Sequence, residues 1–149
     1  MKSFTFRLER LLRHARRKKD ETAAQWASAR RQVDITLREI AGHEAHMRRV
    51  RDNHSPKEGL PVSAVALQTA HSHVLWHRQK LIGNHEQLQQ RQISLKQATA
   101  TLNTARQDCK KLEKLREKKY TSWRSAVLKR EQKELDAVGS RQRQEPTRA

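Results

Sequence analysis

Apolar residues recur every seven positions in two long stretches of the chain. The second stretch has one column of Leu67, Val74, Leu81, Leu88, Leu95, Leu102 and Cys109, and another, three residues later, of Ala70, His77, Asn84, Arg91, Ala98, Ala105 and Leu112. The first stretch has Leu12, Lys19, Trp26, Val33, Ile40 and Met47 in one column and Leu8, Ala15, Thr22, Ala29, Thr36, His43 and Val50 in the other. These columns are the a and d positions of a heptad repeat, and their length predicts a coiled coil.

The proline and glycine positions divide the chain into two helices. No proline occurs from residue 4 to about 52 or from about 64 to 138, and good helix formers dominate both ranges. Pro56, Gly59 and Pro61 mark the break between them. We expect a single domain over residues 1–149: a helix over about 4–52, a loop over 53–63, a second helix over 64–138 and a flexible tail over 139–149. Ser63 is the expected N-cap of the second helix and Gly139 its expected end.

The fold class that follows is all-α, an antiparallel coiled-coil hairpin of two long helices with an overhanging C-terminal helix. In such a hairpin the residue numbers of facing residues add to a constant. A symmetric loop favours a constant of 117, which places Leu8 opposite Cys109, Trp26 opposite Arg91 and His46 opposite His71. The chain after about residue 112 then projects beyond its partner.

Composition limits the function classes. Of the 149 residues 34% are hydrophobic and 33% charged, which argues against a compact multilayer core. A single cysteine excludes an intramolecular disulfide and fits a reducing compartment. No secretion signal and no membrane-spanning apolar run is recognisable, so we expect a cytoplasmic protein.

Catalysis, cofactors and metals are not expected. The phosphate-binding string G-x-x-x-x-G-K-[ST] is missing, and a rod offers no pocket for a small-molecule substrate. His73 and His77 have a spacing that can bind zinc, but no cysteine or carboxylate completes a ligand set near them. We therefore expect solvated or seam histidines, and for Cys109 a small core hydrophobe.

Positive charge is abundant, with 33 Lys and Arg, 16 Asp and Glu, and a net charge of +17. Eight basic and two acidic residues lie in residues 1–20, and ten basic and three acidic residues lie in residues 110–133. The hairpin brings both ranges to one end. A nucleic acid is one candidate partner, although the basic runs lack a forked basic region and stacking aromatic residues. An acidic protein cavity fits the charge equally well.

Three apolar side chains near the loop lie outside the seam: Leu75 and Ile82 at b positions and Trp76 at a c position. An exposed apolar patch commonly marks a partner-binding surface. Self-association of the hairpin or packing over neighbouring side chains would also account for it.

The opening string Phe4-Thr5-Phe6-Arg7-Leu8-Glu9-Arg10-Leu11-Leu12 and the closing string Lys129-Arg130-Glu131-Gln132-Lys133-Glu134-Leu135-Asp136 resemble the FliJ family of flagellar export proteins. The two helices and the Pro/Gly turn between them match as well, so that the resemblance covers essentially the whole chain. It implies a non-enzymatic hairpin similar to the stalk of rotary ATP synthases, located in the cytoplasm and at the cytoplasmic face of the membrane.

The resemblance also implies partners and contact residues. The terminal end would enter the hexameric flagellar export ATPase, and the loop side would bind the membrane export gate, with export chaperones as further partners. The residues expected to contact the ATPase are Arg7, Arg10, Arg13, Arg16, Lys118, Lys119, Trp123, Arg124, Lys129 and Arg130. Those expected to contact the gate are His71, Leu75, Trp76 and Ile82. The alternatives are the equivalent stalk of a virulence secretion system and a basic coiled-coil nucleic-acid or scaffold protein.

Overall fold

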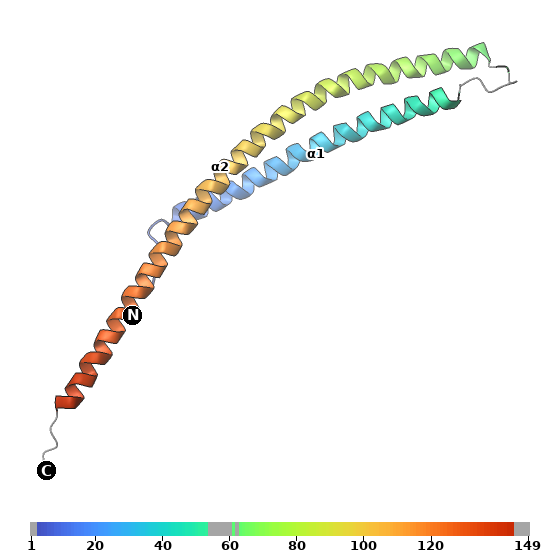
Figure 1. Ribbon diagram of the computed structural model, residues 1–149. Helices are drawn as coiled ribbons and strands as arrows, with labels where there is room; N and C mark the ends of the chain where they lie inside the picture. The colour runs from blue at the N-terminus through green and yellow to red at the C-terminus, as the bar shows by residue number, and fades with distance from the viewer. Residues whose placement is uncertain (1–2, 54–60, 62, 145–149) are drawn as a thin grey trace. The chain divides into compact units, whose positions relative to one another are not determined.

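Two long α-helices make up nearly all of the structure, which is a computed structural model describing residues 3–53, 61 and 63–144. Helix α1 spans Glu9–Asn53 and helix α2 spans Ala64–Gln144 (Figure 1). The two helices pack against each other as the predicted antiparallel hairpin, and the described ranges contain no strand. The predicted loop falls mostly on residues 54–60 and 62, which lie outside the described residues.

Contacts divide the hairpin into two units. The terminal unit comprises residues 1–19 and 104–149, and the loop-side unit comprises residues 20–103. Each unit contains a segment of α1 and a segment of α2. No helix in the described part of the chain is long and apolar enough to cross a membrane.

The first helix begins five residues later than predicted. Phe4 and Phe6 precede it, and the spacing of two that separates them is that of extended chain rather than of a helix. Phe6 is buried, and Phe4 packs against the same core. The backbone N–H of Glu9 donates to the carbonyl of Phe6 at 3.1 Å, where the helix starts. Burying both rings from one extended segment therefore replaces the first predicted turn.

The second helix starts where predicted but ends later. Ser63 directly precedes α2, and its carbonyl accepts the first helical hydrogen bond, from the N–H of Leu67 at 3.1 Å. Gly139 is not the end, because the helix continues to Gln144. The backbone of Gly139 lacks the left-handed φ of a glycine C-cap.

The core of each unit consists of predicted seam residues. In the terminal unit, Leu12 and Cys109 are buried with Phe6, and Phe4, Leu8, Ala15 and Leu112 surround them. In the loop-side unit the buried positions are Thr22, Val33, Thr36, Ile40 and Leu102. Every buried residue except Phe6 occupies an a or d position of the heptad columns, which confirms the seam on both helices.

The predicted alignment of the two helices is wrong by about one heptad. In the loop-side unit, the indole N–H of Trp26 donates to the hydroxyl of Thr99 at 3.1 Å, a pair whose numbers add to 125. In the terminal unit, Glu9 pairs with Arg116 at 3.3 Å, and these numbers also add to 125. Both units thus fit a constant near 124 rather than 117. The value 124 is one heptad above 117 and is the nearest constant that again places the a positions of one helix opposite the d positions of the other.

Hydrogen bonding explains the alignment. The predicted pairing set Trp26 against Arg91, whereas the structure gives each of them a better partner. The indole lies beside the small Thr99, and the guanidinium of Arg91 donates to the carbonyl of Gln32 at 2.9 Å and to the hydroxyl of Thr36. Since a polar group buried without a partner is costly, these bonds outweigh the symmetry of the loop.

Candidate partner-binding surfaces

Positive charge is concentrated in the terminal unit. Of the 33 Lys and Arg residues in the chain, 22 lie in residues 1–19 and 104–149, together with 8 of the 16 acidic residues. The terminal unit therefore carries a surplus of 14 positive charges and the loop-side unit a surplus of three. A field of this strength attracts an acidic surface and repels a second copy of the same unit.

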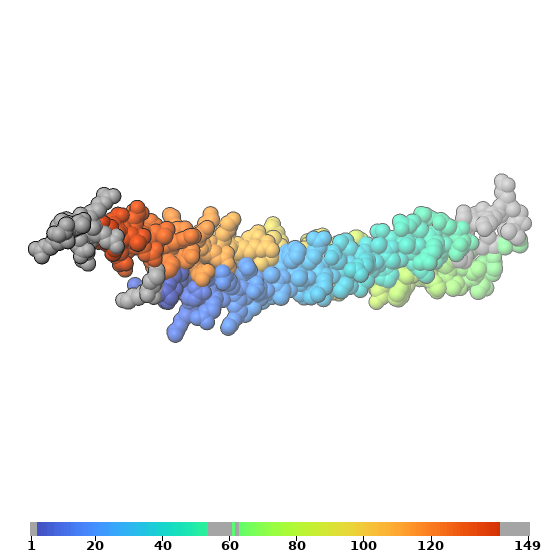
Figure 2. Space-filling model, turned by 90° about the horizontal axis from the view of Figure 1, so that it is seen from below, coloured from blue at the N-terminus to red at the C-terminus, as the bar shows by residue number. Residues whose placement is uncertain are grey.

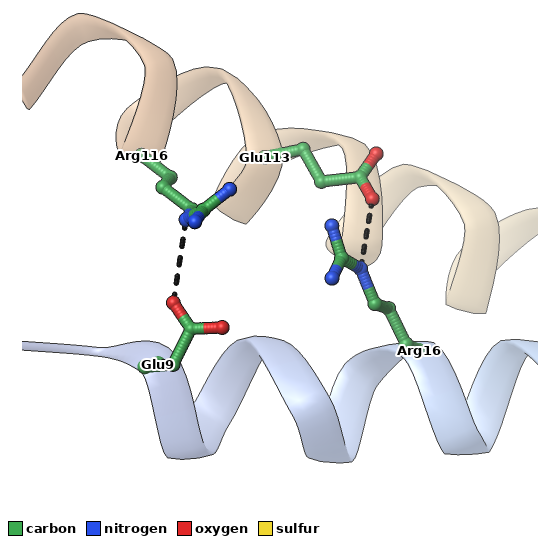
Figure 3. Close-up of polar contacts among 4 residues, drawn as sticks. All are labelled: Glu9, Arg16, Glu113 and Arg116. Carbon is green, nitrogen blue, oxygen red and sulfur yellow. Dashed lines mark hydrogen bonds and ion pairs between the residues drawn. The ribbon is translucent and has the colours of Figure 1, made fainter. Parts of the chain in front are cut away.

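The basic residues predicted to bind a partner lie on the surface of this unit. Arg7, Arg10, Arg13, Arg16, Lys118, Lys119, Arg124, Lys129 and Arg130 are all exposed. Arg16 is engaged within the unit, because its Nε lies 3.1 Å from Glu113 Oε1, beside the Glu9–Arg116 pair (Figure 3). The two ion pairs link the start of α1 to α2 in the terminal unit.

Trp123, also predicted as a contact residue, is half-buried by an aromatic cluster. Its ring lies 5.7 Å from that of Phe4 and 5.8 Å from that of Tyr120, and the Phe4 and Tyr120 rings meet edge to face at 5.3 Å. The sequence interpretation missed this cluster, because it placed Phe4 inside the first helix. The extended spacing of Phe4 and Phe6 is the signal that could have revealed it.

Beyond this cluster, α2 carries apolar side chains with little covering them. Leu128 is 55% exposed, Leu135 72% and Val138 54%. In the terminal unit, the orange-to-red end of α2 extends past the N-terminal segment in both views (Figures 1 and 2). Arg124, Lys129 and Arg130 lie along the same part of α2. The overhang predicted from the sequence is thus an exposed helix with both apolar and basic side chains.

The loop-side unit exposes the three apolar residues noted in the sequence. Leu75, Trp76 and Ile82 are 49%, 53% and 63% exposed. Leu75 and Ile82 are two helical turns apart and share one face of α2, whereas Trp76 projects about 100° away from Leu75. The side chain of His71 is exposed and lines a groove of mixed character, whose other lining residues are Glu44, Met47, Arg48, Val50, Arg51, Leu67, Ala70, Val74 and Arg78. The predicted patch therefore consists of an aliphatic part and a separate aromatic part.

Trp76 packs against histidines of the seam. Its ring contacts His77 edge to face at 4.8 Å and His43 at 5.8 Å, and Lys80 Nζ lies 5.4 Å from the ring centroid. The predicted contact between His46 and His71 is replaced, because the His46 ring stacks on His77 at 4.4 Å. This difference follows from the one-heptad change in alignment.

His43 and His77 form a polar contact across this part of the seam, with 2.8 Å between their Nδ1 atoms. Partial burial is the largest cause that lowers the pKa of His77 below its ordinary 6.5. The positive charges of His46, His43 and His73 lower this pKa further, in that order. Among the described residues, no three His, Cys, Asp or Glu side chains are arranged to hold a metal ion.

The chain matches a known protein family. The family model described as flagellar FliJ protein matches residues 4–147. No curated protein and no solved structure matches the chain.

Proposed function

The chain belongs to the flagellar FliJ protein family, whose role is in flagellar export, and from this premise we propose that it is the non-enzymatic stalk of the flagellar export apparatus. In this proposal the terminal unit binds the hexameric export ATPase and the loop-side unit binds the membrane export gate. The protein works in the cytoplasm, at the inner face of the cell membrane. Escort of export chaperones is a further role consistent with the family.

The observation that carries the proposal is the concentration of charge at the terminal unit together with the overhanging α2. A surplus of 14 positive charges suits an acidic cavity. The exposed Leu128, Leu135 and Val138 supply apolar area that such a cavity can cover. Charge brings the partners together and sets their orientation, while buried apolar area supplies most of the affinity.

The loop-side unit suits a different kind of partner. Its charge surplus is only three, and its exposed side chains Leu75, Trp76 and Ile82 are apolar. Large aromatic and aliphatic residues of this kind are typical anchors in protein interfaces. The exposed His71 and the groove beside it extend the available surface. These residues form the proposed contact with the export gate.

The charge also favours a second candidate, a nucleic acid. The two functions differ in how binding depends on salt, because a protein that neutralises many phosphates loses affinity steeply as salt rises. The equivalent stalk of a virulence secretion system would bind the export ATPase of that system instead. Binding of the chain to the flagellar ATPase and not to a virulence-system ATPase therefore separates these two alternatives.

The proposal is tested by co-sedimentation of the purified chain with the flagellar export ATPase. The variant Arg7→Glu, Arg10→Glu, Lys118→Glu, Lys119→Glu reverses four exposed charges of the terminal unit. A matched control, Arg31→Glu, Arg38→Glu, Arg48→Glu, Arg49→Glu, reverses four exposed charges of the loop-side unit. We expect the first variant to lose ATPase binding and the control to retain it. Equal binding by both would contradict the proposed contact, and tight binding of duplex DNA with a steep salt dependence would favour the second candidate.

A further inference from the structure

Four histidines gather where the two helices meet in the loop-side unit. His43 and His46 come from α1, and His73 and His77 come from α2. The Nδ1 atoms of His43 and His77 lie 2.8 Å apart, and the His46 ring stacks on the His77 ring at 4.4 Å. His73, one helical turn before His77, lines the same surface hollow as His46, Trp76 and His77. His77 is thus surrounded by imidazoles from both helices.

The short contact between His43 and His77 requires a particular protonation state. A hydrogen bond between two ring nitrogens needs one N–H donor and one unprotonated acceptor, so only one proton lies between the two Nδ1 atoms. If both rings become cationic, the acceptor is lost and two like charges face each other at close range. The contact therefore joins α1 to α2 only while at least one of these rings is neutral.

The surroundings do not compensate for a second positive charge. The titratable groups facing His77 are His43 and His46 from α1 and His73 from α2, and these, after burial, are the causes that lower its pKa. Lys80 adds another cation at the Trp76 ring. In the part of the chain that the structure describes, none of these four histidines forms an ion pair with a carboxylate. Acidification thus accumulates positive charge around His77 without a partner.

This part of the seam has little else to hold it. The buried residues of the loop-side unit are Thr22, Val33, Thr36 and Ile40 on α1 and Leu102 on α2. Among the described residues, none on α1 after Ile40 and none on α2 before Leu102 is buried. Leu67, a predicted seam position, is 47% exposed. Regions with few buried apolar contacts are those that open locally at the lowest free energy.

We propose that the histidine cluster makes the pairing of α1 and α2 proton-dependent, with the loop-side segments paired near neutral pH and loosened as the pH falls below the ordinary range of histidine. Because Trp76 packs against His43 and His77, loosening would also release the aromatic part of the loop-side surface. The inference concerns the isolated chain and does not depend on the proposed partners.

The direction in which pH changes the stability of the paired state follows from the linkage between folding and protonation. Since the pKa of His77 is lower in the folded chain than 6.5, the unfolded segment binds more protons near pH 6. The paired state is therefore most stable above about pH 6.5. Its stability relative to the unpaired state decreases as the pH falls from 6.5 toward the lowered pKa of His77. Carboxylates stay ionised over the range from pH 7.5 to about 5.5, so histidines dominate the change.

Hydrogen–deuterium exchange of the full-length chain tests the proposal at pH 7.5 and pH 5.5, with rates corrected for intrinsic exchange and with EDTA present so that no metal replaces the shared proton. We expect amides of residues 41–50 and 70–81 to lose protection at the lower pH, because the pKa of His77 is lowered in the paired state. The variant His43→Gln/His77→Gln keeps hydrogen-bonding side chains that do not titrate, and should lose much less. The matched control His14→Gln/His85→Gln changes two exposed histidines and should lose as much protection as wild type.

The inference is overturned if wild type loses no protection, or if His43→Gln/His77→Gln loses as much as wild type. NMR titration of the wild-type imidazoles gives an answer even if that variant fails to fold. The imidazole of His77 should titrate with a pKa below the ordinary 6.5. A pKa of His77 at or above 6.5 would contradict the proposal.

Discussion

The indole N–H of Trp26 donates to the hydroxyl of Thr99, and this hydroxyl in turn donates to the carbonyl of Leu95 at 2.8 Å. The contact joins α1 to α2 and fixes their alignment in the loop-side unit. A second network agrees with it, because Thr36 donates to the carbonyl of Gln32 at 3.0 Å and both groups accept from Arg91. Polar seam residues therefore specify the pairing, as isolated polar positions do in other coiled coils.

This alignment predicts which engineered cysteines can form a disulfide. In a Cys109→Ala background, Ala29→Cys with Leu95→Cys should cross-link rapidly within one chain, since their numbers add to 124. Ala29→Cys with Leu88→Cys tests the alignment of 117. These positions would be offset by seven residues, about 10 Å along the helix, beyond the reach of a disulfide. Mass spectrometry of non-reduced peptides decides between the two, and efficient linkage of 29 to 88 would refute the observed alignment.

Replacing Trp26 by phenylalanine should destabilise the loop-side unit. The substitution removes the indole N–H and part of the ring, and loss of a neutral hydrogen bond in a partly buried site costs about 1 kcal/mol. Thermal or urea unfolding measures the change. Tyr120→Phe, which removes only the hydroxyl of an exposed ring, is the comparison. An unchanged unfolding midpoint for Trp26→Phe would mean that the contact with Thr99 does not contribute to pairing.

Two glycines inside the helices offer a stabilising change. A Cβ added at Gly42 or at Gly83 meets no atom within 4 Å. Alanine should therefore stabilise each helix by roughly 0.5–1 kcal/mol, because it lowers the conformational entropy of the unfolded chain without a clash. Urea unfolding of the single and double variants tests this, and the two effects should add, since neither added methyl group has an atom within 4 Å. A destabilised variant would show that the backbone at that site needs glycine.

The heptad columns could be predicted from the sequence because apolar spacing is a property of each helix alone. Leu12, Val33, Ile40, Leu102 and Cys109 are buried where the spacing placed them. The alignment of the two helices could not be predicted from the sequence. Pairings in which facing residue numbers add to 117 or to 124 both place the a column of one helix against the d column of the other. Only the hydrogen bonds of particular side chains distinguish them, and these depend on atomic geometry.

The candidate surfaces, too, could be predicted from the sequence only in part. Exposure of Leu75, Trp76 and Ile82 followed from their positions outside the seam. The aromatic cluster of Phe4, Tyr120 and Trp123 did not, since it forms between an extended segment and a helix far away in sequence. Helix propensity alone extended the first helix over residues 4–8, where burial of Phe6 decides the conformation instead.

Removing the loop-side apolar side chains should separate binding from stability. Leu75→Ala, Trp76→Ala and Ile82→Ala together should change the unfolding midpoint little, because all three are about half exposed or more. Leu102→Ala, at a buried seam position, should cost about 2–5 kcal/mol. Trp76→Ala alone should weaken binding to the export gate by roughly 2 kcal/mol, about thirtyfold. A triple variant that unfolds early yet binds the gate when folded would show that these residues serve packing.

The most direct test of the proposed stalk is a ternary binding measurement with the export ATPase and the cytoplasmic part of the export gate. The wild-type chain should bring both into one complex. The terminal variant Arg7→Glu, Arg10→Glu, Lys118→Glu, Lys119→Glu should lose the ATPase and keep the gate, whereas Trp76→Ala should bind the gate about thirtyfold more weakly and keep the ATPase. If either variant loses both partners while remaining folded, or if the wild-type chain never holds both at once, the account of two separate partner-binding units is contradicted.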